Sequence, residues 1–309
     1  MRRYFEDATP LVQILFSGFI VVVVFLIIFL LGLLSGLLFF DVNVLELPAL
    51  MNDLQSPGSL MILKYFQMVQ AIGLFVVPPF VIAVLLSSEP LRYLSLEKKP
   101  KAWSVLLAIL FMIVAIPAIN MLAAWNAQME LPESLAGVEA WMKRSEESAA
   151  VLMEAFLRAD TIGVLLLNIF MIAILPGIGE ELLFRGVLQP QLSALARSKT
   201  AGLFLAAFLF SAMHLQFYGF LPRFLLGLIF GYMLLWSGSL WLPVLAHFVN
   251  NVIAVIFYFY AGKSDINISE LEELGASSEA YIYVLLSFVI SAVLLWQFKK
   301  STQNNTSYG

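Results

Sequence analysis

The chain of 309 residues contains no cysteine and only two histidines. The absence of cysteine excludes disulfide bonds, thiolate metal ligands, a cysteine nucleophile and prenylation of the chain itself. Charged residues are also scarce, at 12%, and the net charge of −4 comes without a basic stripe, so nucleic acid is not an expected partner. Histidine chemistry is limited to His214 and His247, both in apolar surroundings.

Hydrophobic residues, in contrast, make up 61% of the chain, and the mean hydropathy is +0.92. Several apolar runs reach the roughly 20 residues that a helix needs to cross about 30 Å of hydrocarbon. Arg2 and Arg3 resemble the start of a signal peptide, but the apolar run over 11–40 is too long and no small-residue cleavage site follows it. We therefore expect an integral membrane protein that retains this first span.

The hydropathy pattern predicts an all-α polytopic transmembrane bundle of about eight spans. They are expected near 11–40, 60–87, 103–125, from 161 through the charged motif described below, 200–216, 221–237, 240–261 and 280–298. The basic segments (Arg2-Arg3, 88–102, Arg197/Lys199 and Lys299-Lys300) fall on one side and the acidic loops on the other, with Arg223 as an exception. By the positive-inside rule, both termini are expected to be cytoplasmic.

Three further local predictions concern one segment between spans and two proline motifs within spans. Residues 126–160 are acidic, with apolar residues spaced as in amphipathic helices that lie on or near the membrane on the extracytoplasmic side. Pro78-Pro79 is expected to kink the second span. Pro176-Gly177 is expected to break the fourth span and free backbone groups there.

Charged and polar residues recur within three of the apolar spans. Glu180, Glu181 and Arg185 lie in the fourth span, Phe210 and His214 in the fifth, and His247 and Asn251 in the seventh. Each charge costs roughly 2.5 to 3.5 kcal/mol at the centre of a membrane helix, so such a cluster suggests a functional site. Glu181 and Arg185 are four residues apart and can pair on one helix face. Glu180 is rotated by about 100° and is the carboxylate that this pair leaves less neutralised.

Each of these features also has a structural interpretation. A lone histidine often bonds a neighbouring helix, a Glu-Arg pair at this spacing is usually a staple, and an asparagine is more often packing than catalysis. Together they supply a base, a water-orienting group and oxyanion donors. No serine elbow, zinc helix of the His-Glu-x-x-His type, phosphate loop or pair of intramembrane aspartates is present. The remaining mechanism is hydrolysis by glutamate-activated water. It could work with or without a metal such as zinc, which two histidines and a carboxylate could hold.

In their order and spacing, these residues resemble the CPBP family of intramembrane proteases, also called the type II CAAX prenyl endopeptidase or Abi family. The matches to its pattern are Glu180-Glu181 with Arg185, Phe210 with His214, and His247 with Asn251. The resemblance covers about 161–255 and implies catalytic helices there. The remaining chain is expected to divide into two parts. Residues 1–160 hold the N-terminal spans and the acidic segment, and residues 256–309 hold the last span and a polar, disordered tail.

By this resemblance, Glu180 and His214 activate the attacking water, His247 and Asn251 donate to the oxyanion, and Glu181 and Arg185 support them. The implied activity is endopeptidase cleavage of membrane-associated or peptide substrates. No cofactor is expected; if a metal is used, Glu180, His214 and His247 are the expected ligands. The expected surroundings are the lipid bilayer, most plausibly a bacterial inner (plasma) membrane.

Two other functions stay open at this point. The chain could be a non-enzymatic bacteriocin-immunity or scaffold protein of the same fold, in which the cluster only holds helices together. It could also carry ions or protons on its buried carboxylates, although the paired broken helices of an inverted repeat are not seen.

Overall fold

The structure is a computed structural model that describes residues 7–43, 45–263 and 281–303. Its described residues form helices and no strand. Six of the described helical runs are long and apolar enough to cross a membrane, or seven if one bent pair counts as a single span. The predicted polytopic all-α bundle is therefore confirmed, with six or seven candidate spans among the described residues instead of about eight. Arg2-Arg3, the acidic loop between 264 and 280 and most of the C-terminal tail lie outside the described residues.

The first half of the chain supplies three spans. The first is α1 (Pro10–Phe40), and a short α2 (Leu47–Asn52) leads to the second, which joins α3 (Pro57–Ala71), η1 (Ile72–Val76) and α4 (Val77–Leu86). After α5 (Pro90–Tyr93), the third span consists of α6 (Ala102–Val114) and α7 (Ile116–Ala127), bent by 46°. The bend coincides with Pro117, which cannot donate the backbone hydrogen bond of a continuous helix.

The second half carries the charged motifs. The fourth span joins α9 (Ile162–Asn168), η3 (Ile169–Ile174), α10 (Leu175–Glu181), η4 (Leu182–Leu188) and α11 (Gln189–Leu195). It is followed by α12 (Lys199–Ala212), the 3-10 turn η5 (Phe217–Gly219), α13 (Phe220–Ser237), α14 (Trp241–Ala261) and α16 (Tyr281–Gln303).

The expected fifth span is shorter than predicted. α12 has 14 residues, about 21 Å of helix at 1.5 Å per residue, which is less than the roughly 30 Å of the hydrocarbon core. It ends at Ala212 because the chain then turns, with Leu215 in the left-handed backbone region. α12 is therefore a short helix packed against α13, and it ends inside the expected membrane thickness.

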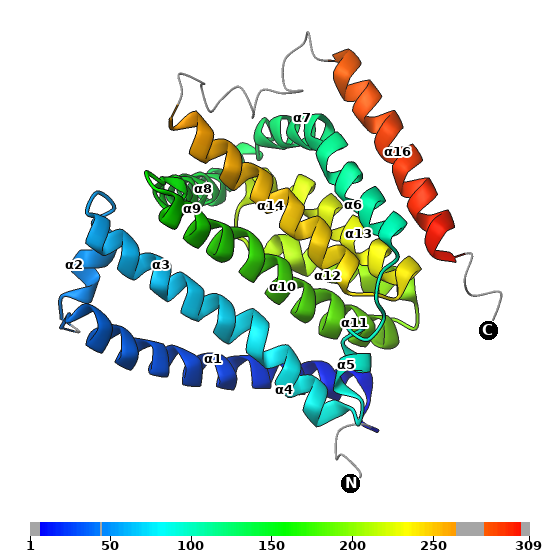
Figure 1. The fold of residues 1–309 in the computed structure, drawn as a ribbon, viewed down its shortest axis with the longest axis horizontal. Helices are drawn as coiled ribbons and strands as arrows, with labels where there is room; N and C mark the ends of the chain where they lie inside the picture. The colour runs from blue at the N-terminus through cyan, green and yellow to red at the C-terminus, as the bar shows by residue number, and fades with distance from the viewer. Residues whose placement is uncertain (1–6, 44, 264–280, 304–309) are drawn as a thin grey trace.

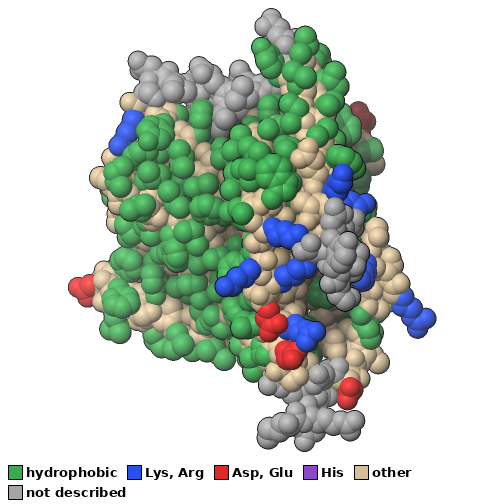
Figure 2. Space-filling model, turned by 45° about the vertical axis from the view of Figure 1, so that its right-hand side comes forward, with side chains coloured by type: hydrophobic (Ala, Val, Ile, Leu, Met, Phe, Trp, Pro, Cys, Tyr) green, Lys and Arg blue, Asp and Glu red, His purple; other side chains and the backbone are tan. Residues whose placement is uncertain are grey.

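The bundle brings the basic connections to one end. Figure 1 shows the start of α1, α5, the turn between α11 and α12, and the end of α16 on the right-hand side, whereas α2 and α8 lie on the left. Figure 2 turns that right-hand side forward and shows blue Lys and Arg side chains gathered on it. The described basic connections therefore share one end of the bundle, and the assignment of that end to the cytoplasm stays a prediction.

The acidic segment forms a short 3-10 turn, η2 (Glu133–Leu135), and one long helix, α8 (Ala136–Leu157). Figure 1 shows α8 nearly end-on, so its axis runs across the direction of the spans. Its last residues, Ala155, Phe156 and Leu157, are buried, and Phe156 packs on Leu63 and Met171 of two spans. The segment is thus largely helical, as predicted, and its position at the membrane surface stays a prediction.

The prediction that Pro176-Gly177 breaks the fourth span was wrong. The helix continues through both residues, and the π-helical turn η3 ends two residues before Pro176. Proline has no N–H to give to the carbonyl of Ile172, four residues earlier. The side chain of Asn251 donates to that carbonyl instead, at 3.0 Å. Pro78-Pro79 follows the π-turn η1 in the same way.

Candidate active site

Glu181 is the centre of the polar cluster. Its side chain is fully buried, and its Oε1 accepts hydrogen bonds from Arg185 Nη1 and from His247 Nδ1, both at 2.9 Å. Arg185 is equally buried and donates from Nη2 to the carbonyl of Gly227 at 3.0 Å. The predicted Glu181–Arg185 pair is thus present, but Glu181 also holds His247. One carboxylate therefore connects α10, η4 and α14.

Aromatic rings surround this cluster. The Arg185 guanidinium carbon lies 4.5 Å from the centre of the Phe210 ring and 5.5 Å from that of Phe230. Phe230 also stacks on the His247 ring, with centroids 5.3 Å apart and planes 21° apart. These faces attract cations and exclude water from the charges. The sequence motifs gave no reason to single out Phe230.

Glu180 is placed differently from its neighbour. Its side chain is 14% exposed, and its buried Oε2 has no hydrogen-bond partner within the described residues. The nearest ionisable contact is His247 Nε2 at 4.0 Å, which is beyond hydrogen-bond length. The opposite ring nitrogen, Nδ1, is the one that Glu181 holds. Glu180 thus presents an unpaired oxygen beside a fixed imidazole.

His214 reaches the same region from the end of α12. The Phe210 ring contacts both histidine rings edge-on, with centroids 5.2 Å from His214 and 5.9 Å from His247. Glu180 is within electrostatic range of His214, but the two side chains share no hydrogen bond. His214 is exposed, whereas His247 is buried.

The hydrogen bonds fix which nitrogen of each histidine carries a proton. His214 Nδ1 lies 2.9 Å from the Phe210 carbonyl, which can only accept, so that nitrogen must donate. His247 Nδ1 faces the Glu181 carboxylate and likewise donates. In each ring Nε2 is then the nitrogen not used by these bonds. It accepts a hydrogen bond when the ring is neutral and donates one when the ring is an imidazolium.

The turn that carries His214 is fastened at several points. The Asn126 side chain donates to the Phe217 carbonyl and accepts from the Leu221 N–H. Arg223 donates twice to Gln216, and Glu146 of α8 accepts from the Tyr218 N–H at 3.2 Å. Arg223, which departs from the predicted charge distribution, therefore serves this turn. Asn126 and Glu146 lie far away in sequence, so no local motif identified them.

Asn251 has a structural partner. One N–H of its side-chain amide goes to the Ile172 carbonyl, and its oxygen accepts from the Asn250 amide at 3.0 Å. An amide nitrogen carries two hydrogens, so the second N–H is not used by this bond. Asn251 joins the cluster through α14, one turn after His247.

The glycine pair Gly227 and Gly231 of α13 has a second role beside close packing. A methyl group on Gly227 would lie 3.1 Å from Ala207, and one on Gly231 would lie 2.8 Å from Leu203, so both glycines let α12 approach. Their carbonyls also accept from Arg185 and from Gln189, at 3.0 and 3.2 Å. The polar side chains spaced four residues apart on η4 and α11 thus bond successive turns of α13.

The residues do not form a preorganised metal site. Within the described part of the chain, no group of three His, Asp, Glu or Cys side chains is arranged to hold a metal ion. Glu180 Oε2 and His247 Nε2 lie 4.0 Å apart, and the bond from His247 Nδ1 to Glu181 leaves Nε2 free to ligate. The alternative ligand set of Glu180, His214 and His247 is, however, not gathered around one point among the described residues.

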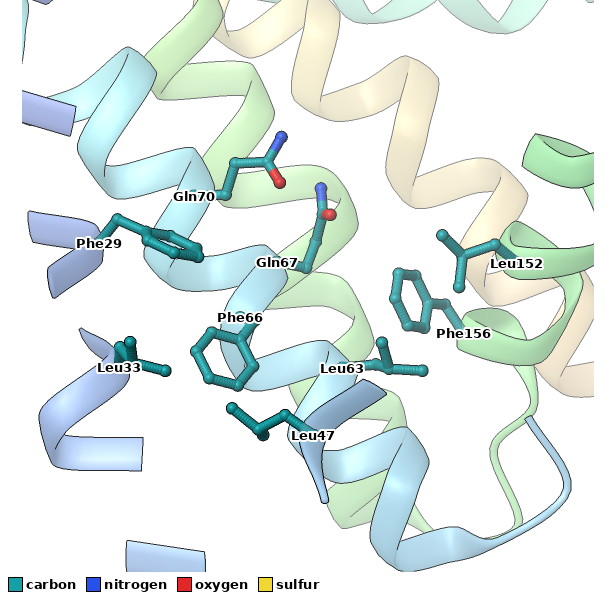
Figure 3. Close-up of a pocket in the computed structure, with 9 residues that line it drawn as sticks. All are labelled: Phe29, Leu33, Leu47, Leu63, Phe66, Gln67, Gln70, Leu152 and Phe156. Carbon is teal, nitrogen blue, oxygen red and sulfur yellow. The ribbon is translucent and has the colours of Figure 1, made fainter. Parts of the chain in front are cut away.

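A cavity of about 240 Å³ lies away from the site, between α1, α2, α3 and α8. Figure 3 shows it lined by leucine and phenylalanine side chains, with Gln67 and Gln70 projecting side by side from α3. None of the predicted catalytic residues lines this cavity.

Comparison with known proteins agrees with the residue pattern. Residues 162–253 match the family model of type II CAAX prenyl endopeptidase Rce1-like proteins. This segment belongs to that family. The Rce1-like segment contains every predicted site residue, from Glu180 to Asn251.

A curated relative, the uncharacterized protein YpbD of Bacillus subtilis (strain 168), is 30% identical over 90 residues. The match covers 28% of this chain and 43% of YpbD. No solved structure matches the chain significantly.

Proposed function

We propose that the chain is an intramembrane endopeptidase that hydrolyses peptide bonds of membrane-associated or peptide substrates with water activated by Glu180 and His214. The observation that carries this proposal is the buried, unpartnered Oε2 of Glu180 beside a histidine that Glu181 holds in place. A carboxylate with an unused oxygen can accept a proton from water. The outward Nε2 of His214 can accept the second hydrogen and orient that water.

In the proposed reaction, Glu180 takes a proton from water while the water oxygen bonds to the peptide carbonyl carbon. His247 Nε2–H and the second N–H of Asn251 donate to the oxygen that becomes negative. The C–N bond then breaks, and Glu180 returns its proton to the departing amine. A positioned base contributes roughly 10² to 10⁴ in rate, and one oxyanion donor roughly 10² to 10³.

The oxyanion role requires a specific protonation state. Since His247 Nδ1 donates to Glu181, Nε2 can donate only if the ring is an imidazolium. Glu180, Glu181, Arg185 and a protonated His247 together carry no net charge.

We further propose that the reaction needs no metal and that the protein acts in a bacterial plasma membrane. The absence of a converged ligand set within the described residues supports metal independence. The Bacillus relative supports the bacterial setting.

The test compares cells that express wild-type protein or Glu180→Gln, with Glu147→Gln on the exposed face of α8 as a matched control. Quantitative proteomics of their membranes should show peptide fragments that depend on Glu180 and are unaffected at Glu147. A substrate found in this way should then be cleaved by purified wild-type protein and not by Glu180→Gln. Cleavage that persists in well-folded Glu180→Gln would refute the mechanism.

The same experiment addresses the immunity or scaffold alternative, which the connecting role of Glu181 favours. In that case the three membranes would contain the same fragments, while immunity or partner binding would be lost only when the helix contacts are disturbed.

A further inference from the structure

A groove of about 790 Å³ lies on the seam between α10 and α14, beside the segment that joins α5 to α6. Its floor is apolar and consists of Ile174, Ile178, Val244, Leu245 and Phe248. Phe248 follows His247 in sequence, and Ile178 precedes Glu180 by two residues. None of the proposed catalytic residues lines the groove, so it is a separate site next to the reaction centre.

The wall of this groove is held in place by hydrogen bonds. The Trp241 indole N–H donates to the Leu96 carbonyl at 2.9 Å, and the Leu240 N–H donates to the Ser95 carbonyl at 2.9 Å. The Ser239 hydroxyl donates to the Lys98 carbonyl. Ser95 adopts a left-handed backbone conformation that turns the segment back over α14. The groove is therefore preformed, which lowers the entropic cost of binding.

Charged side chains of opposite sign are among the residues that line the groove. Glu97 and Lys99 both line it and are both exposed, and Lys99 makes no ion pair within the described residues. They lie in the basic loop that is predicted to face the cytoplasm, together with Trp241, a residue typical of the membrane interface. The groove thus combines an apolar floor with one exposed acidic and one exposed basic side chain.

We propose that this groove binds a phospholipid whose headgroup carries both a phosphate and a primary ammonium, as in phosphatidylethanolamine. An acyl chain lies on Val244, Leu245 and Phe248, because each buried methylene contributes about 0.8 kcal/mol. Lys99 pairs with the phosphate, and Glu97 accepts hydrogen bonds from the ammonium. The charge pattern decides between lipids: an anionic headgroup without ammonium meets repulsion from Glu97. This site does not depend on the proposed peptidase activity.

The test is native mass spectrometry of the full-length protein in detergent, titrated with phosphatidylethanolamine, phosphatidylcholine or phosphatidylglycerol of the same acyl chains. The expected affinity falls in that order, since choline cannot donate to Glu97 and glycerol carries no positive charge. Glu97→Gln should remove most of the preference for ethanolamine over glycerol. Lys99→Gln should weaken all three lipids about threefold, as expected for one exposed ion pair.

Two further variants separate the groove from general lipid contact. Leu245→Trp fills the floor and should weaken binding about tenfold, equivalent to roughly two methylenes removed from the groove. Lys101→Gln in the same loop and Leu205→Trp on the exposed face of α12 are controls that should leave binding unchanged. Both residues lie outside the groove lining.

The proposal would be overturned if the three lipids bound equally and Leu245→Trp changed nothing. It would also be overturned if phosphatidylglycerol bound best, or if a peptide substrate displaced the lipid one for one. The last result would show that the groove receives substrate.

Discussion

Replacing Glu181 by glutamine should destabilise the protein strongly, whereas the same replacement at Glu180 should leave its stability almost unchanged. Glu181 is fully buried and accepts hydrogen bonds from two groups, Arg185 and His247. Glu181→Gln conserves volume but leaves the buried Arg185 charge without its counterion. Removing one member of a buried ion pair costs roughly 3 to 5 kcal/mol. At about 2 to 4 °C per kcal/mol, that corresponds to a melting temperature about 6 to 20 °C lower.

Glu180→Gln removes no hydrogen bond to Oε2 that the structure contains. Its cost should therefore stay below about 0.5 kcal/mol, or roughly 1 to 2 °C in melting temperature. The assay is intrinsic fluorescence during heating of both purified variants in the same detergent, with peptide hydrolysis measured in parallel. Both variants should lose activity, but only Glu181→Gln should lose stability.

A double replacement provides the control. Glu181→Leu combined with Arg185→Met removes both charges and should regain part of the stability that either single replacement loses. Equal melting temperatures for Glu180→Gln and Glu181→Gln would contradict the division of roles. So would a Glu181→Gln protein as stable as wild type.

Three other predictions follow from single contacts. Asn251→Ala should cost about 1 to 3 kcal/mol in stability, because it leaves the Ile172 carbonyl unsatisfied. The cost should be smaller in a Pro176→Ala background, where residue 176 regains a backbone N–H. If the shifts in melting temperature of the two replacements simply add, this coupling is refuted. Gly227→Ala should cost about 1 to 3 kcal/mol in stability, because the added methyl group meets Ala207. Gly18→Ala is the control: it has open space around it and should be neutral or slightly stabilising. Thermal unfolding of both variants measures the difference. Elemental analysis of the purified protein should find less than one zinc per chain, and the proposed peptidase activity should persist in the presence of chelators. Stoichiometric zinc whose removal abolishes cleavage would refute the metal-free mechanism.

The sequence was sufficient for the helical architecture because each span carries its own signal. An apolar run of about 20 residues predicts a membrane helix whatever it packs against. The length of α12 was not predictable in the same way. Its apolar pattern continues past Ala212, and the turn that ends it is held by Asn126, Glu146 and Arg223, of which the first two lie far away in sequence.

The candidate site was partly visible in the sequence for a related reason. Glu181 and Arg185 are helix neighbours, so their spacing alone predicts their contact. The bond from Glu181 to His247 joins residues 66 positions apart, and a helix pattern contains no information about it. Similarly, the sequence shows that Pro176 lacks an N–H, but only the packing of α14 shows that Asn251 replaces it. Local sequence rules therefore predicted a break at Pro176, where a side chain distant in sequence supplies the missing hydrogen bond.

The contrast between the two adjacent glutamates has an evolutionary consequence. Glu181 bonds both Arg185 and His247, so replacement of any one of the three is expected to destabilise the protein even where its activity is no longer needed. Glu180 has no such protection. Given the proposed function, position 180 should vary first among descendants that abandon peptide hydrolysis, while the other three residues persist. The residue at that one position would then distinguish active lineages from those that keep only the scaffold.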